Sequence, residues 1–309
     1  MKPTVIFMGT PDFAVGILKT LIDTCDVKLV VSQPDKKVGR KQELRKTPVK
    51  ELAEQYEIPV FQPEKIKADY DCVLEHDVDL IVTCAYGQLI PSAILEHPKY
   101  GCINVHASLL PKYRGGAPIH KAIMNGEKVT GITIMYMVDK MDAGNIISKA
   151  EYQIKDTDNV GILHDELSKL GSTLLAETLP KIIDGTNASI PQNEEEVTFA
   201  WNIKREEERI DFEQDGKTIL NQIRGLNPWP VANFLLNDME YKVYEAYMEL
   251  GSKGNIGDIV ELKKDSIGIQ AKDSIIYITS LKPFGKKKMI VRDYLNGINK
   301  DELKNAKIN

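Results

Sequence analysis

The chain has 309 residues, more than one hydrophobic core usually supports, so its length predicts two domains. Its formal net charge of −5 argues against a globally basic nucleic-acid binder, although a local cluster of cations could still contact phosphate. The longest apolar runs are far shorter than the roughly 20 residues of a membrane helix, and the first residues lead directly into a strand pattern, so we expect a cytoplasmic protein. The 4 cysteines lack CxxC spacing, so we expect reduced buried thiols and no metal site.

The first half of the chain alternates short apolar runs with helical patterns. The first run, residues 4–8, ends at Gly9, after which Thr10 is the expected N-cap of a helix with Pro11 in its first turn. Gly9 could admit a dinucleotide phosphate, but the G-x-G-x-x-G spacing is missing, so we interpret it as a tight turn. The alternation predicts an α/β fold with a Rossmann-like, mostly parallel sheet. Further strands are expected at residues 27–32, 59–61, 79–84 and 101–105, with helices near 47–56 and 91–96.

A basic segment, residues 33–50, follows the second predicted strand. Seven of its eighteen residues are Lys or Arg and two are acidic, and Gly and Pro prevent a helix until Thr47 and Pro48 begin the next one. Two interpretations remain about equally supported. The segment is either a solvated surface loop or a contact for a phosphate backbone at the edge of the sheet where ligands bind.

The second half divides into the end of one domain, a linker and a smaller domain. We place the first domain at residues 1–184, the polar linker at 185–205 and the second domain at 206–309. After one helical segment near 216–225, several short β-prone runs separated by turns predict an OB-like β-barrel, which could bind RNA or pack as an inert appendage. The first domain is expected to end with a helix at 118–125, strands at 131–138 and 146–154, and a long helix from about 159 to 183.

The stretch from Asn104 to Asp142 carries the residues best suited to chemistry. Asn104 and His106 are two apart, so on a strand both side chains point to the same face, where an amide and an imidazole could stabilise the oxyanion of an acyl transfer. Asp142 follows the next predicted strand and could stabilise a His106 cation and take part in proton transfer. Each of these residues alone would more often be structural, so the hypothesis depends on the combination. Ser108 lacks a G-x-S-x-G elbow, which makes a serine hydrolase a weak alternative.

The order of motifs in this stretch resembles the signature of the 10-formyltetrahydrofolate-dependent formyltransferases. The matching elements are Asn104-x-His106-x-Ser108-Leu109-Leu110-Pro111 with Arg114-Gly115, then Gly131-x-Thr133 and Asp139-x-x-Asp142-x-Gly144. Motifs in both predicted domains further resemble the branch of this family that acts on methionyl-tRNA. These are Phe7-Met8-Gly9-Thr10-Pro11-Asp12-Phe13-Ala14, Gln33-Pro34-Asp35, Thr47-Pro48-Val49-Lys50, Phe61-Gln62-Pro63, Ala85-Tyr86-Gly87, Leu226-Asn227-Pro228-Trp229-Pro230 and Gly285-Lys286-Lys287.

The resemblance implies formyl transfer from 10-formyltetrahydrofolate, as cosubstrate, to the α-amino group of methionine on initiator methionyl-tRNA, by direct attack of the amine and without metal. It places Asn104, His106 and Asp142 at catalytic positions. The implied folate contacts are Ser108, Leu109, Leu110 and Pro111, and more loosely Leu89 and Ile90. The implied tRNA contacts are Arg40 and its neighbours Lys37, Lys41 and Arg45, in a loop where Glu43 departs from the usually basic pattern.

Three other functions share the central stretch. The acceptor could be a small amine, or water in a formyltetrahydrofolate hydrolase, and a non-catalytic RNA-binding protein could retain the same scaffold. The basic segment and the second domain favour tRNA as the acceptor. No obvious apolar stripe marks the second domain, so we expect a monomer.

Overall fold

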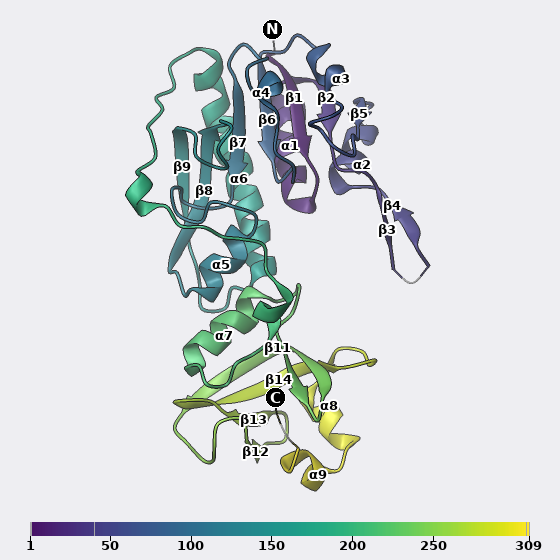
Figure 1. The fold of residues 1–309 in the computed structure, drawn as a ribbon, viewed down its shortest axis with the longest axis vertical. Helices are drawn as coiled ribbons and strands as arrows, with labels where there is room; N and C mark the ends of the chain where they lie inside the picture. Colours follow the sequence, from purple (N-terminus) through teal and green to yellow (C-terminus); the bar gives the residue numbers. More distant parts are fainter. Residues whose placement is uncertain (1, 40, 307, 309) are drawn as a thin grey trace. The chain divides into compact units, whose positions relative to one another are not determined.

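The computed structural model describes residues 2–39, 41–306 and 308, which form two compact units (Figure 1). The first unit contains the chain up to residue 118, then 129–153 and 164–201. The second contains 119–128, 154–163 and the chain from 202 onward. No helix among the described residues has the length and apolar character that crossing a membrane requires.

A seven-stranded sheet forms the centre of the first unit. Its strands are β1 (Thr4–Gly9), β2 (Asp26–Val31), β5 (Val60–Phe61), β6 (Leu80–Cys84), β7 (Cys102–His106), β8 (Val129–Tyr136) and β9 (Ile146–Gln153). The spatial order is β5-β2-β1-β6-β7-β8-β9. The first five strands in this order run parallel to one another, and β8 and β9 each run antiparallel to the strand before them. β1 and β6 are almost entirely buried, as strands covered on both faces should be. The predicted mostly parallel α/β sheet is confirmed.

Helices cover both faces of this sheet. They are α1 (Asp12–Thr24), α2 (Pro48–Gln55), α3 (Asp71–Leu74), α4 (Ser92–Leu95) and α6 (Val160–Ile183). Ile6 of β1 belongs to one buried cluster with Val73 of α3 and Ile94 of α4. On the other face α1 and α6 pack closely, since a Cβ added to Gly171 would lie 3.2 Å from the side chain of Ile17. The sheet is therefore held between two helical layers, as its apolar strands require.

Thr10 does not cap α1 as the sequence predicted. The helix begins at Asp12, and Pro11 occupies the N-cap position. The Thr10 hydroxyl instead donates to the Tyr86 carbonyl oxygen at 3.2 Å and accepts from the Gln33 amide at 3.3 Å. The prediction was wrong because Thr10 links the chain ends that follow β1, β2 and β6.

The second unit is built on an antiparallel sheet of six strands. They are β10 (Asn233–Leu236), β11 (Met239–Leu250), β12 (Ile259–Leu262), β13 (Ile267–Gln270), β14 (Ser274–Pro283) and β15 (Met289–Ile290). The order is β10-β11-β14-β13-β12, with β15 beside β14. In the part of the chain that the structure describes, β10 and β12 do not pair with each other, so the sheet is a curled half-barrel. The helices of this unit are α5 (Pro118–Met124, from residue 119 onward), α7 (Gly216–Gly225), α8 (Val291–Asn296) and α9 (Lys300–Lys304).

Much of the predicted linker lies along the first unit. Ile190 exchanges two backbone hydrogen bonds with Ile146 of β9, at 2.8 and 2.9 Å. Arg114 donates its N–H to the Thr198 carbonyl at 2.9 Å, and the Ala200 N–H donates to the Arg114 carbonyl at 2.7 Å. These contacts place the chain as far as residue 201 in the first unit, while the domain limits at 184 and 206 stay predictions. One short 3-10 helix, η1 (Glu194–Glu196), lies in the predicted linker, and another, η2 (Arg205–Glu208), begins at its last residue.

Candidate active site

Asn104 lies in β7, between β6 and β8, with its side chain half-buried. Its Oδ1 accepts a hydrogen bond from the hydroxyl of Thr83, a buried residue of β6, at 2.8 Å. Thr83 therefore sets the orientation of the amide. Among the described residues Nδ2 has no hydrogen-bond partner, so its protons are available to a bound carbonyl oxygen.

His106 ends β7 and is 5% exposed. Its Nε2 lies 3.0 Å from the main-chain carbonyl oxygen of Tyr113, which can only accept, so Nε2 carries a proton. The other ring nitrogen, Nδ1, lies 3.8 Å from Oδ2 of Asp142. In the neutral ring Nδ1 thus has a lone pair beside this carboxylate. It becomes a hydrogen-bond donor only after it takes up a proton.

Asp142 lies in the loop between β8 and β9, with φ of +48°, a left-handed conformation that Asp adopts more readily than most residues. Its Oδ2 accepts a hydrogen bond from the N–H of Gly115 at 2.8 Å. The structure therefore brings His106 and Asp142 together, and Asn104 lies two residues before His106 on the same face of β7. This is the grouping that the sequence predicted.

Two glycines permit the close approach of the segments around Asp142. Gly115 has φ of +119°, and a Cβ there would lie 2.7 Å from the carbonyl oxygen of Ala200. A Cβ at Gly144 would lie 1.8 Å from the carbonyl oxygen of Tyr136. A side chain at either position would separate these segments, which explains the physical need for both glycines of the motif.

Gln192 fixes the Asp142 loop through its main chain. Its Nε2 donates to the carbonyl oxygens of Asp142 and Gly144, each at 2.8 Å. Its Oε1 accepts from Nε of Arg114 at 3.0 Å and from Nη2 at 2.7 Å, and Arg114 is fully buried. Sequence reasoning missed Gln192, because a single glutamine in a polar segment interpreted as a linker forms no pattern.

A second bond ties the same segment to Arg114. Glu194 accepts from Nη2 of Arg114 at 2.9 Å and from Nζ of Lys140 at 2.8 Å. These hydrogen bonds lower the pKa of Glu194 to about 2. Because Lys140 is in the Asp142 loop, residues 192 and 194 hold that loop at separate points.

The predicted folate segment, residues 108–111, forms a fixed turn. The Ser108 hydroxyl donates to the Lys112 carbonyl at 2.7 Å, and the Thr133 hydroxyl donates to the Ser108 carbonyl at 2.7 Å. The Leu110 N–H donates to the Thr133 hydroxyl oxygen at 3.1 Å, and the Leu110–Pro111 peptide bond is cis. Ser108, Leu110 and Pro111 are buried, so the side chain of this segment that is half open to a ligand is Leu109.

The looser part of the folate prediction falls just beyond β6. Leu89 is 56% exposed, whereas Ile90 is 8% exposed and belongs to the buried cluster of the sheet. An exposed leucine at this edge offers apolar surface to a flat heterocycle. Ile90 contributes to packing in the structure as described.

The basic segment forms a β-hairpin of β3 (Lys36–Val38) and β4 (Glu43–Arg45). Lys36 is paired with Arg45 and Lys37 with Leu44, and all four are exposed. Residues directly opposite each other share a face and successive residues alternate between faces. The predicted tRNA contacts Lys37 and Arg45 therefore lie on opposite faces of the hairpin.

Lys41, a third predicted tRNA contact, belongs to the turn between β3 and β4. Lys41 is exposed there. Arg40 lies outside the described residues, so its contact with tRNA stays a prediction. Glu43, the departure noted in the sequence, is exposed at the start of β4.

A polar cluster closes the base of the hairpin. Nζ of Lys50 lies 2.7 Å from Oδ2 of Asp35 and 2.6 Å from Oε1 of Gln62. Nε2 of Gln62 donates to Oδ1 of Asp35 at 2.7 Å and to the Gln33 carbonyl at 2.8 Å. Burial opposes ionisation of Asp35, but the bonds from Gln62 and Lys50 keep its pKa below the ordinary value. Three motifs that are distant in sequence thus meet where the hairpin leaves the sheet.

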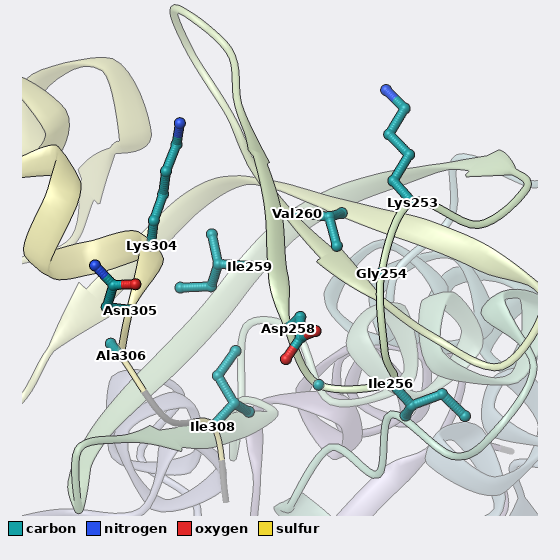
Figure 2. Close-up of a pocket in the computed structure, with 11 residues that line it drawn as sticks. Lys253, Gly254, Ile256, Asp258, Ile259, Val260, Lys304, Asn305, Ala306 and Ile308 are labelled. Carbon is teal, nitrogen blue, oxygen red and sulfur yellow. The ribbon is translucent and has the colours of Figure 1, made fainter.

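A hollow of about 540 Å³ lies in the second unit, between the start of β12 and the C-terminal segment (Figure 2). Lys253 at its rim pairs with Glu261 at 2.6 Å, and the Asp258 carboxylate accepts from the Asn255 N–H at 3.0 Å. These charged groups already have partners, so we assign no ligand to this hollow. Within the described ranges, no group of three or more His, Cys, Asp and Glu residues is placed to hold a metal ion.

Comparison with known families and proteins gives matches along nearly the whole chain. The family described as "Formyl transferase" matches residues 1–179, and "Formyl transferase, C-terminal domain" matches residues 202–299. A methionyl-tRNA formyltransferase of Staphylococcus epidermidis is 54% identical over 297 residues, covering 95% of this chain and 96% of the relative. One from Staphylococcus aureus is 52% identical with the same coverage.

Solved structures with the same fold are more distant in sequence. An N-formyltransferase from Helicobacter canadensis, in complex with folinic acid and dTDP-3-aminofucose, has a TM-score of 0.67 and 20% identity, covering 92% of this chain and 100% of its own. HypX from Aquifex aeolicus, in complex with tetrahydrofolic acid, has a TM-score of 0.63 and 19% identity, covering 96% of this chain and 47% of its own. At this identity the likeness concerns the fold.

Proposed function

The chain belongs to the formyl transferase family, and we propose that it transfers a formyl group from 10-formyltetrahydrofolate to the α-amino group of methionine on initiator methionyl-tRNA, as translation initiation requires. The observation that carries the reaction class is the approach of His106 and Asp142 to 3.8 Å, with Asn104 two residues before His106 on the same face of β7. The acceptor is supported by the names of the relatives at 52% and 54% identity and by the basic hairpin.

Asn104 polarises the formyl carbonyl. Its Nδ2 has protons to donate because Oδ1 is bound to Thr83. As the amine nitrogen forms its bond to the formyl carbon, negative charge grows on the formyl oxygen, and a donor placed for that charge lowers the barrier by about 3–4 kcal/mol. Holding the amine close to the formyl carbon in the right orientation supplies much of the remaining reduction of the barrier. Because the formyl group is also small, no covalent enzyme intermediate is required.

His106 and Asp142 move the proton. The attacking amine loses one proton to Nδ1 of His106 or to Oδ2 of Asp142, which lie 3.8 Å apart. Once protonated, Nδ1 is a donor and Asp142 balances its charge. The same proton is returned to N10 as the bond between N10 and the formyl carbon breaks, so the products are formylated methionyl-tRNA and tetrahydrofolate.

The cations of the hairpin bind the acceptor in this proposal. Lys37, Lys41 and Arg45, with Arg40, contact phosphates of the acceptor stem, while the half-barrel after residue 206 binds the tRNA elsewhere. The folate cosubstrate lies against Leu109 and Leu89, which have accessible apolar surface. We propose that the enzyme works as a monomer in the cytoplasm, where its acceptor is made.

One assay tests the acceptor and the reaction together. Radiolabelled formyl donor is supplied with initiator methionyl-tRNA, with elongator methionyl-tRNA, with a small amine or with no acceptor. Label that appears on the initiator tRNA supports the proposal. Label on a small amine, or release of free formate at an undiminished rate without any acceptor, would replace it with one of the alternative functions.

A further inference from the structure

We propose that Phe199 and Trp201 form a stacking platform for the unpaired base at the 3′ end of the acceptor tRNA. This inference rests on the proposed function, because the amino acid that carries the reacting amine is esterified to that terminal nucleoside. The two rings are stacked, with centroids 5.0 Å apart and planes within 3° of parallel. Phe199 is 47% exposed and Trp201 58% exposed, so their stack is open to a further ring.

The backbone keeps both rings at the surface. Ala200, between them, is fully buried, and its carbonyl accepts the Ala117 N–H at 3.0 Å. Phe199 forms a parallel β-bridge with Arg114. The backbone of Arg114 makes the two hydrogen bonds of this bridge to residues 198 and 200, on either side of Phe199. Alternation along such a segment sends residues 199 and 201 to the side opposite the buried Ala200. Two large aromatic rings left in water at a fixed position suggest a binding surface.

The platform is continuous with the proposed catalytic residues. Arg114, the backbone partner of Phe199, is followed by Gly115, whose N–H is bound to the Asp142 carboxylate at 2.8 Å. A nucleoside whose amino-acid ester presents its amine to Asp142 therefore has its base beside this segment. Stacking there would fix the last nucleotide and with it the direction from which the amine approaches.

One cation near the platform suits the phosphate of a single strand. Lys112 is exposed and makes no ion pair within the described ranges, and the N–H of the next residue, Tyr113, donates to the Thr198 hydroxyl at 2.9 Å. Aromatic faces with nearby cations are the usual means of binding unpaired nucleotides. Glu195 and Glu196 are also exposed just before the pair, so stacking rather than charge must supply most of the attraction.

Tryptophan fluorescence tests the platform without any turnover. The chain has 2 tryptophans, so the variant Trp229→Phe leaves Trp201 as the sole reporter. We expect the trinucleotide CpCpA to quench its emission saturably, and the dinucleotide CpC, which lacks the terminal adenine, to quench it much less. Equal quenching by both, or none by either, would overturn the proposal.

Steady-state kinetics tests its role in the reaction. For Trp201→Ala we expect the KM for methionyl-tRNA to rise about tenfold, equivalent to about 1.4 kcal/mol, with the KM for the formyl donor unchanged. Trp201→Phe keeps a stacking ring and should remain within about threefold of the parent enzyme. The matched control is Tyr56→Ala, which removes an aromatic ring of similar exposure, 45%, at the end of α2.

The outcomes separate this inference from the proposed function. A parent enzyme that formylates methionyl-tRNA, combined with a Phe199→Ala/Trp201→Ala variant whose KM for tRNA is unaltered, would overturn the platform alone. A parent enzyme that does not formylate methionyl-tRNA would overturn the function, whereas the quenching assay remains an independent test of base stacking. A raised KM for tRNA with no response of Trp201 to CpCpA would assign the rings to the methionine side chain and also overturn the platform.

Discussion

Gln192 donates two hydrogen bonds to the loop of Asp142, to the carbonyl oxygens of Asp142 itself and of Gly144, each at 2.8 Å. The amide cannot turn without cost, because its oxygen is bound by Nε and Nη2 of the fully buried Arg114. The carboxylate of Asp142 thus takes its position from a side chain fifty residues later in the sequence. A proton acceptor that must meet an incoming amine benefits from such rigid placement.

Gln192→Glu should separate positioning from stability. A glutamate can still accept hydrogen bonds from Arg114 but cannot donate to the carbonyl oxygens of Asp142 and Gly144. The Asp142 loop therefore loses its fixed position, whereas the contact between residue 192 and Arg114 is kept. We expect kcat to fall about 10- to 100-fold, with the KM values for both substrates and the thermal midpoint near those of the parent enzyme. Gln192→Ala, which removes both contacts, should lower the midpoint as well. Equal kcat in the Glu variant and the parent would show that these bonds do not position Asp142.

Asp142→Asn tests the carboxylate directly. The amide is isosteric and can still accept from the Gly115 N–H, so the loop should keep its shape. It cannot take a proton or balance a cation at His106. We expect turnover to fall by about 10²- to 10⁴-fold with little change in folate affinity, measured by calorimetric titration of tetrahydrofolate. Normal turnover in this variant would remove Asp142 from the mechanism.

The sequence predicted the parts of this site that depend on local periodicity and motif. The pair Asn104 and His106 followed from the two-residue repeat of a strand, and Asp142 from a loop after the next strand. What the sequence could not supply was the set of partners. That Thr83 orients the Asn104 amide, and that the Tyr113 carbonyl fixes the proton of His106 on Nε2, depends on how strands and turns meet in space.

The same limit explains the error at Thr10, and it explains why the sequence did not show the bonds made along residues 185–205. Patterns of apolar residues predicted the α/β order, which is confirmed, and an OB-like β-barrel in the second unit, which is borne out as an antiparallel curled sheet, a half-barrel. Thr10 was assigned to a helix cap because local preference favours Thr there, but two neighbouring strand ends compete for its hydroxyl. Residues 185–205 have the composition of a linker, yet backbone bonds to Arg114 and Ile146 hold much of the segment in place. Long-range hydrogen bonds of this kind leave no periodic signal.

Substitutions of His106 can distinguish its two nitrogens. In His106→Asn the amide nitrogen lies near the former Nδ1 and can donate, but it cannot carry a proton from the amine. In His106→Gln the longer side chain can replace the bond from Nε2 to the Tyr113 carbonyl. If proton transfer through Nδ1 is the main role, both variants should lose about 10²-fold or more in kcat. If donation to the oxyanion is the main role, only the Asn variant should retain substantial activity. Full activity in His106→Ala would rule out both roles.

The acid titration of the Glu194 carboxyl reports on its hydrogen bonds to Arg114 and Lys140. The pKa of this carboxyl is about 2, below its ordinary 4.5, chiefly because of the hydrogen bond from Arg114 and next that from Lys140. A lowered carboxyl pKa adds stability that is complete above the ordinary value and is lost as the pH falls through about 2. We expect carbon-detected NMR to give a Glu194 midpoint near 2 in the parent enzyme. Lys140→Ala should raise that midpoint partway, and an unchanged midpoint would show that Lys140 does not bind Glu194 in solution.

The two faces of the hairpin allow a test of how it contacts tRNA. Lys37 shares a face with Leu44, and Arg45 shares the other with Lys36. If the hairpin enters a groove of the acceptor stem, phosphates lie on both sides, and Lys37→Ala and Arg45→Ala should each reduce the slope of log K against log salt by about 1. If it lies flat on the stem, only one of the two variants should do so.

Binding measured by filter retention across a range of salt concentrations distinguishes these cases. Lys46→Ala is the matched control, because Lys46 follows β4 and is paired with Glu54 at 2.6 Å. We expect that variant to keep the parent slope, and we expect folate affinity to be unchanged in all three. Parent slopes in both Lys37→Ala and Arg45→Ala would exclude the described strands of the hairpin from the tRNA contact. The contact would then have to come from the turn residues or from the second unit.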